Sequence, residues 1–161
     1  MSSSSLKTRR AVVLPFREPS WNAPFERVGC SLTPEQSEEA ARLLRAVRSD
    51  LRAARLLVAD AEQENDVIGF HAQQAVEKAM KAALVQSGAE IPYTHDLGFL
   101  LDALAPREST TPESVAQADW LTPWAVAARY GSSAGSLDRN AALAVAEDAV
   151  GWATTIVEGR P

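Results

Sequence analysis

Seven polar side chains stand out because their types and spacing could bind a ligand. They fall in three short groups: His71, Gln74 and Lys78; His95 and Asp96; Arg129 and Tyr130. The first group recurs every three or four residues, so a helix would present it on one face. Lys and Arg could contact phosphate oxygens, a Tyr ring could stack on a base, and imidazole or amide groups could bond a ribose or a base edge.

Each group also has an interpretation that needs no ligand. Thr94, His95 and Asp96 could simply cap a helix, and Arg129 could hold the last carbonyls of one. Lys78 could pair with Gln74 or Glu77 on the surface. The residues alone leave both interpretations open.

Several kinds of chemistry are disfavoured. One Cys and two His residues offer no metal-ligand spacing, so we expect no metal and no cofactor. The chain has no Walker lysine loop, no Gly-rich dinucleotide loop and no Gly-x-Ser-x-Gly elbow. An enzyme of a familiar motif class is therefore not expected.

The composition predicts one helical domain that carries these groups. The chain has 161 residues, 46% of them hydrophobic and only 6% aromatic, and 29 are alanine, which favours helices. The single Cys30 cannot form an internal disulfide, so a reducing, cytoplasmic setting is expected. No segment approaches the ~20 apolar residues of a membrane-spanning helix, and we expect no membrane partner.

The charge divides the chain into two parts. Residues 1–31 hold three prolines and a basic excess, and we interpret them as an irregular N-terminal arm before a helical domain at 32–161. The basic start is followed by too short an apolar run for an export signal. The whole chain carries a net charge of -5, which excludes bulk coating of nucleic acid and leaves room for a small, local phosphate site.

About five helices position the candidate residues. The first begins after the cap Thr33 and has an apolar stripe to about residue 61, opposite Arg42, Arg45, Arg48, Arg52 and Arg55. That arginine face is either solvated, with local partners such as Glu38, Glu39 and Asp50, or a surface for anions or a partner. The second helix, capped by Asn65 or Asp66, runs to about Ser87 and should turn His71, Gln74, Lys78 and Lys81 toward water.

The remaining helices are shorter or interrupted. Thr94 should cap a short helix from His95 to about residue 104, and the next begins near residues 111–113. Pro123 should kink that helix or make it restart with Thr122 as a cap. A last helix runs from about residue 137 to Glu158. The prediction is an all-α, up-and-down antiparallel bundle with a four-helix core.

Three motifs resemble the HEPN family in order and spacing. They are FHAQQAVEKAMKA at 70–82, YTHDL at 93–97 followed by Leu100 and Leu101, and LTPWAVAARY at 121–130. The resemblance covers about residues 38–158 and leaves out the arm. It implies a small prokaryotic helical bundle, usually a homodimer, often encoded beside a minimal nucleotidyltransferase. It is also similar to the helical substrate-binding domain of some aminoglycoside nucleotidyltransferases. Many members act on or bind nucleotides or RNA, and several are toxins of toxin–antitoxin pairs.

The ribonuclease motif of that family is missing here. Its ribonucleases carry an Arg followed, after four to six residues, by a His. Glu64, Asn65 and Asp66 stand at that spacing before His71, and Gly88, Ala89 and Glu90 before His95. Arg129 precedes no histidine and cannot shuttle protons. Gly131 also replaces a proline that is common in the family.

The sequence therefore predicts a non-catalytic HEPN-type module that dimerises and binds a nucleotide or RNA, or a nucleotidyltransferase partner. One alternative is a metal-independent ribonuclease toxin that uses His71 or His95 with Arg129. Another is a structural interaction bundle that contacts a partner chain through Trp120, Trp124 or Trp152.

Overall fold

The computed structural model describes residues 32–108, 110–130 and 134–159, with the side chains of 128–130 left out. The expected N-terminal arm at 1–31 lies outside the described residues. Six α-helices and one 3₁₀-helix follow one another: α1 (Pro34–Val58), α2 (Asn65–Gln86), α3 (Leu97–Leu104), α4 (Glu113–Ala116), η2 (Ala118–Leu121), α5 (Trp124–Tyr130) and α6 (Arg139–Glu158). The described ranges contain no strand.

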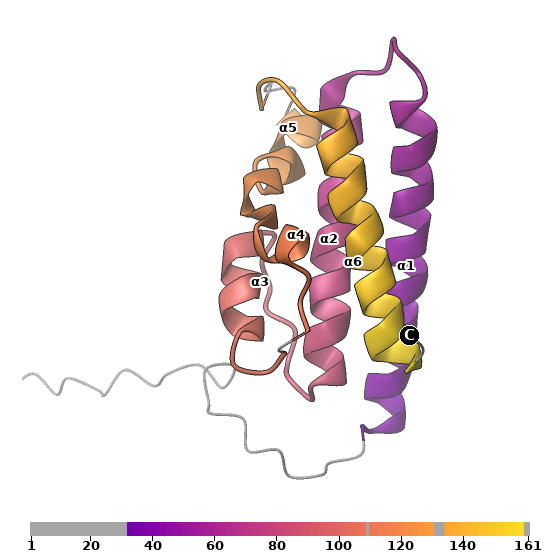
Figure 1. Cartoon of the computed structure of the whole chain (residues 1–161). Helices are drawn as coiled ribbons and strands as arrows, with labels where there is room; N and C mark the ends of the chain where they lie inside the picture. Colours follow the sequence, from indigo (N-terminus) through magenta and orange to yellow (C-terminus); the bar gives the residue numbers. More distant parts are fainter. Residues whose placement is uncertain (1–31, 109, 131–133, 160–161) are drawn as a thin grey trace, which may run out of the picture.

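The three long helices α1, α2 and α6 pack side by side as a bundle (Figure 1). In that view α1 ascends, α2 descends, the segment from α4 to α5 ascends, and α6 descends to the C-terminus. This alternation makes an up-and-down bundle in which α4, η2 and α5 together take the place of the fourth helix. The all-α bundle predicted from the sequence is confirmed.

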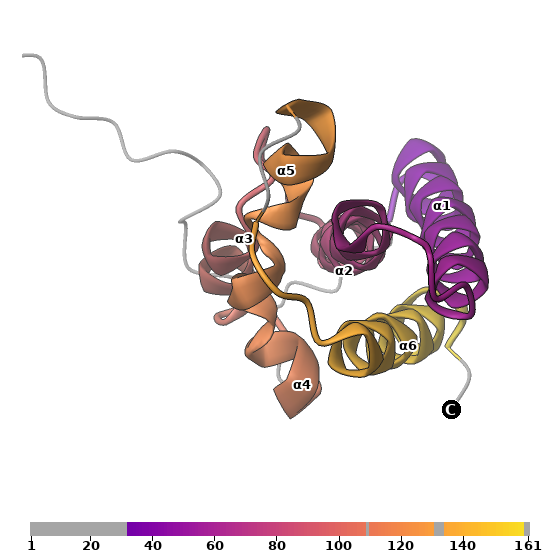
Figure 2. The same cartoon turned by 90° about the horizontal axis from the view of Figure 1, so that it is seen from above.

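Helix α2 is the centre of the fold. It packs against α1, α6, α5 and α3, and 14 of its 22 residues are buried. Seen from above, α1, α6 and the α3–α5 segment surround α2, and the side of α2 between α1 and α5 carries no described helix (Figure 2). The core combines alanines on α1, α2 and α6 with larger side chains such as Leu44, Met80 and Leu100. Alanines on facing helices let the backbones approach closely, and the larger side chains fill the space that remains.

The helix ends follow from local capping. Thr33 and Gln36 form the expected capping box, with Thr33 Oγ1 accepting the Gln36 amide at 3.2 Å, and Gly88 has a left-handed φ of 77° after α2. Two expected caps are displaced. The residue before α2 is Glu64, whose side chain forms no capping bond, and α3 begins at Leu97 with Asp96 as its cap.

Pro123 ends one helical segment and begins another. The chain forms α4 and η2 before the proline and restarts as α5, because proline lacks an amide donor and cannot continue the hydrogen bonds of a helix. Thr122 Oγ1 accepts the Leu97 amide at 3.0 Å and so links the start of α5 to α3. Helix α5 then packs closely on α2, since a Cβ on Gly69 would lie 2.4 Å from Cδ2 of the Trp124 ring.

Candidate functional site

Two of the predicted residues meet on a carboxylate of α1. Asp50 accepts a hydrogen bond from His71 Nδ1 at 3.1 Å and one from Lys78 Nζ at 2.5 Å, and we call these three residues the Asp50 cluster. His71 and Lys78 are seven residues apart, so α2 places them two turns apart on one side. Their side chains are 28% and 26% exposed, and that of Asp50 is 13% exposed. The cluster therefore lies at the surface seam between α1 and α2.

The pairing decides which edge of the His71 ring is free. An ionised carboxylate can only accept hydrogen bonds, so Nδ1 carries the proton that faces Asp50. The opposite nitrogen, Nε2, is then the acceptor and is the atom available to a ligand or a proton. The Lys78 ammonium is neutralised by the same carboxylate, so the cluster offers a polar edge with little net positive charge.

A second carboxylate, on α2 itself, organises a more deeply buried cluster. Glu77 is 3% exposed and accepts from Gln73 Nε2 at 2.8 Å, from Lys81 Nζ at 2.7 Å and from Gln74 Nε2 at 3.3 Å. His95 Nδ1 lies 3.1 Å from each Glu77 oxygen. We call these five residues the Glu77 cluster. The number of donors is expected, because a buried carboxylate must be paired to offset its lost hydration.

The pKa of Glu77 reflects the opposing effects of its burial and of its hydrogen-bond donors. Burial raises the pKa of the carboxyl, while hydrogen bonds from Lys81, Gln73 and His95 and the charge of Lys81 lower it. The lowering effects prevail, so the pKa lies below its ordinary value. Glu77 is consequently ionised at neutral pH and serves as a fixed anchor for the groups around it.

The Glu77 cluster also holds the segment between α2 and α3. Lys81 Nζ donates to the Thr94 carbonyl at 2.8 Å, and Gln73 Nε2 donates to the His95 carbonyl at 3.2 Å. Asp96 Oδ1 accepts the Phe99 amide at 3.2 Å as the cap of α3. The capping interpretation of Asp96 therefore accounts for its contacts, whereas His95 keeps a side chain that is 49% exposed.

The predicted residues thus divide among different settings. The structure brings His71 together with Lys78, and Gln74 together with His95 through Glu77. Arg129 and Tyr130 lie in α5, but their side chains are outside the described residues. The expectation that this face of α2 is turned toward water is wrong for Gln74, which is buried together with its neighbours Gln73 and Glu77.

Sequence reasoning missed the two carboxylates that organise the site. Asp50 was expected to pair with arginines on its own helix, but it turns to α2. One signal was present: Asp50 stands three residues after Val47 and four before Ala54, both buried, and therefore at the edge of the apolar stripe. Glu77 is expected only as a surface partner of Lys78, because no local pattern shows that residues 94 and 95 cover it.

The five arginines of this face of α1 are exposed, and three of them form ion pairs. Arg42 pairs with Glu39 at 2.6 Å, as expected for a local pair. Arg48 and Arg55 instead reach α6, where they pair with Glu158 and Glu147, each at 2.8 Å. These exposed pairs link the outer sides of α1 and α6. Of the three tryptophans expected to contact a partner, Trp124 and Trp152 are buried and Trp120 is 41% exposed.

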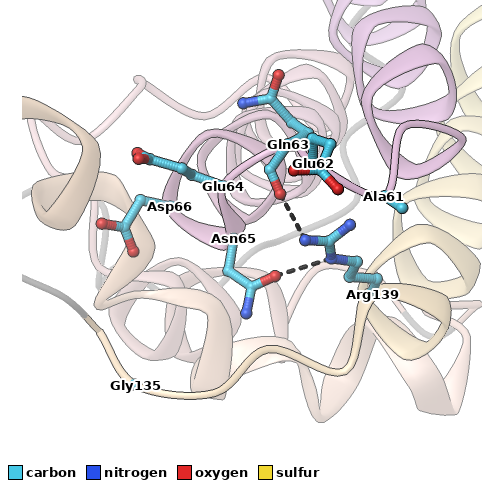
Figure 3. Close-up of a pocket in the computed structure, with 8 residues that line it drawn as sticks. All are labelled: Ala61, Glu62, Gln63, Glu64, Asn65, Asp66, Gly135 and Arg139. Atoms are coloured by element: carbon cyan, nitrogen blue, oxygen red, sulfur yellow. Dashed lines mark hydrogen bonds between the residues drawn. The ribbon is translucent and has the colours of Figure 1, made fainter.

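A separate open pocket of about 630 Å³ lies where the α1–α2 loop meets the start of α6 (Figure 3). Arg139 spans it, with Nε donating to Asn65 Oδ1 at 2.8 Å and Nη2 donating to the Gln63 carbonyl at 2.5 Å. Glu62, Glu64 and Asp66 line the same pocket. Since its arginine is already bonded and its walls are acidic, the pocket would repel a phosphate. None of the predicted site residues lines it.

Neither a metal cluster nor a membrane-spanning helix is found among the described residues. In the described part of the chain, no group of three or more His, Cys, Asp and Glu side chains could hold a metal ion. Within the same residues, no helix has the length and apolar character needed to cross a membrane.

Comparison with known proteins yields one match. The model of the HEPN domain matches residues 40–158, which is most of the chain and nearly all of the described bundle. No curated protein and no solved structure matches the chain.

Proposed function

Because the chain belongs to the HEPN domain family, we propose that it is a non-catalytic module that binds a nucleotide or a short RNA segment. The Asp50 cluster carries this proposal. It places an imidazole and an ammonium group, each about a quarter exposed, at the surface seam between α1 and α2. The missing Arg-to-His spacing in the sequence supports the non-catalytic part.

The cluster has suitable chemistry for a small, reversible site. Lys78 can exchange its contact with Asp50 for a phosphate oxygen, and His71 Nε2 can bond a ribose hydroxyl or a base edge. Both side chains are held before binding, so a ligand pays little conformational entropy to order them. Arg129 and Tyr130, at the end of α5, are further candidate contacts that rest on the sequence motif alone.

Calorimetry with ATP, nucleoside monophosphates and short RNAs tests the proposal directly. We expect the wild-type chain to bind at least one of them, and Lys78→Ala or His71→Ala to weaken that binding. A chain that binds none of them contradicts the nucleotide part, as do silent Lys78→Ala and Arg129→Ala variants. Arg42→Ala is the matched control, because its guanidinium is a surface cation paired within α1.

We also propose that the module works as a homodimer, together with a minimal nucleotidyltransferase. The support is family membership and the side of α2 between α1 and α5, which carries no described helix. Light scattering should give twice the mass of the 17.3 kDa chain. A monomer at all concentrations contradicts the dimer. Co-purification with a nucleotidyltransferase encoded beside this gene tests the partner, and a pair that separates on gel filtration contradicts it.

One geometric feature favours a second function, that of a metal-independent ribonuclease of the toxin type. Both histidines present Nδ1 to a carboxylate, which is the arrangement that orients an imidazole and leaves Nε2 free as a general base. Incubation with total RNA in a metal chelator separates the two functions. Cleavage that is lost in the His71→Ala and His95→Ala variants supports the enzyme, whereas intact RNA supports the binding module.

A further inference from the structure

Tyr93 is the most exposed large hydrophobic side chain among the described residues. It is fully exposed, while Leu56 is 70%, Val126 50% and Trp120 41% exposed. A lone exposed aromatic is ordinary on a protein surface, where its loop is usually free to move. The backbone next to Tyr93, in contrast, is held by hydrogen bonds to α2.

The residues that follow Tyr93 are anchored by the Glu77 cluster. Lys81 holds the Thr94 carbonyl at 2.8 Å, Gln73 holds the His95 carbonyl at 3.2 Å, and Glu77 accepts His95 Nδ1 at 3.1 Å. The Thr94 amide also donates to the Pro92 carbonyl at 3.0 Å, closing a turn around Tyr93. Pro92 has a restricted φ as well. The backbone that carries the ring is therefore fixed before any ligand arrives.

His95, two residues after Tyr93 in the sequence, adds a polar ring to the same segment. Its Nδ1 faces Glu77, so Nε2 is on the half-exposed side and can accept a hydrogen bond. An aromatic face and an imidazole edge on one anchored segment are the two elements that recognise an unpaired base, by stacking and by an edge contact.

We infer that Tyr93 stacks on a nucleobase and that His95 Nε2 bonds the edge of the base, with Glu77 as the positioning residue for both. This inference rests on the proposed function and names the group that is recognised. Lys78 and Lys81 are each neutralised by a carboxylate, so few counterions leave when the ligand binds. Binding is therefore driven by the base and depends only weakly on salt.

The test measures anisotropy of a short, labelled single-stranded RNA, and calorimetry with adenosine and AMP. We expect Tyr93→Ala to weaken binding about tenfold, within the range known for loss of one stacked base, and Tyr93→Phe to retain it. Leu56→Ala is the control for an exposed apolar side chain on another element. The slope of log Kd against log salt should stay below about 1. Adenosine binding shows that the base of a free nucleoside suffices, whereas RNA binding alone shows that the base must belong to a strand.

Several results overturn this inference and can be told apart. If the wild type binds and Tyr93→Ala binds equally well, Tyr93 does not stack and the proposed function stands. A salt slope of several units means that phosphates drive binding. If Tyr93→Ala abolishes self-association but leaves RNA binding unchanged, the ring contacts a second chain instead. No binding by the wild type removes both the inference and the proposed function.

The positioning role of Glu77 has its own readout. Glu77→Gln keeps the size of the side chain but loses its charge, and Lys81→Met removes the donor to the Thr94 carbonyl while leaving Glu77 in place. In both variants we expect faster amide exchange at Thr94 and Asp96 and weaker base binding, with α1 and α6 protected as in the wild type. Unchanged exchange at these two amides contradicts the role, even if binding falls.

Discussion

The Asp50 and Glu77 clusters have the same parts in different surroundings. In each, one carboxylate bridges Nδ1 of a histidine and Nζ of a lysine. The Asp50 side chain is 13% exposed and, among the described residues, has hydrogen bonds to these two partners. Glu77 is 3% exposed and also accepts from Gln73 and Gln74. The difference is therefore in burial and in the number of donors, since the residue types are almost the same.

That difference in burial gives the two clusters different roles. A partly hydrated cluster can exchange its internal contacts for contacts to a ligand at low cost, because water satisfies whatever is released. A buried cluster cannot, since every released group loses a bond without gaining water. The Asp50 cluster is thus suited to binding, and the Glu77 cluster to holding the segment that carries Tyr93 and His95.

Removal of Glu77 should have the largest effect on stability. In Glu77→Ala, Lys81 loses its ion pair, and Gln73 and Gln74 lose an acceptor in the interior. Breaking a buried pair costs roughly 3 kcal/mol, and we expect about that loss in the free energy of unfolding by urea. A loss below about 1 kcal/mol would mean that water replaces the carboxylate, and the two clusters would then be equivalent.

The second-largest effect on stability is expected from acid, which weakens the Glu77 cluster. The folded pKa of Glu77 lies below its ordinary value of 4.5, so its ionised form contributes stability above about pH 4.5. That contribution is lost as the pH falls through the folded pKa. We expect unfolding free energy to decline with acid less steeply in Glu77→Gln than in the wild type. Parallel curves between pH 6 and pH 3 would contradict the assignment.

The change Asp50→Asn should have a smaller effect on stability and a larger one on binding. Its partners reach water, so we expect a loss of about 1 kcal/mol or less. The freed Lys78 charge should tighten binding of AMP and steepen its salt dependence. Calorimetry at two salt concentrations checks this, with Glu147→Gln as a control that removes a carboxylate from α6. Weaker AMP binding would indicate that Asp50 orients His71 for the ligand.

The smallest effect is expected at an exposed ion pair, which sets the baseline for both clusters. Arg42 and Glu39 lie one turn apart on α1, and the Arg42 side chain is 60% exposed. Such pairs contribute about 0.5 kcal/mol or less, so Arg42→Ala should barely shift the urea midpoint. A shift comparable to that of Asp50→Asn would place the Asp50 cluster among ordinary surface pairs.

Much of the fold could be read from local patterns. Thr33 and Gln36 form a capping box, and Pro123 ends one segment and begins another, as their types predict. Each of these features depends on a few neighbouring residues. The α3 cap lies at Asp96 and not at Thr94, because both residue types cap well and local spacing does not distinguish them.

Only part of the candidate site could be predicted from the sequence, because local patterns do not specify contacts between helices. The spacing of His71, Gln74 and Lys78 places them on one helix, but the carboxylate that His71 and Lys78 share, Asp50, lies 21 and 28 residues before them. Arg48 and Arg55 illustrate the same point, since their acidic partners lie on α6. No local spacing specifies such pairs.

The sequence by itself determined the helical class, most helix ends, the family and the polar character of one side of α2. Only the tertiary structure decided which of those polar groups are buried, and therefore which can bind a ligand. Periodicity specifies the direction of a side chain around its own helix. Burial depends on what other elements lay over that side chain, and the 88–96 segment covers Glu77 while the seam at Asp50 stays partly open.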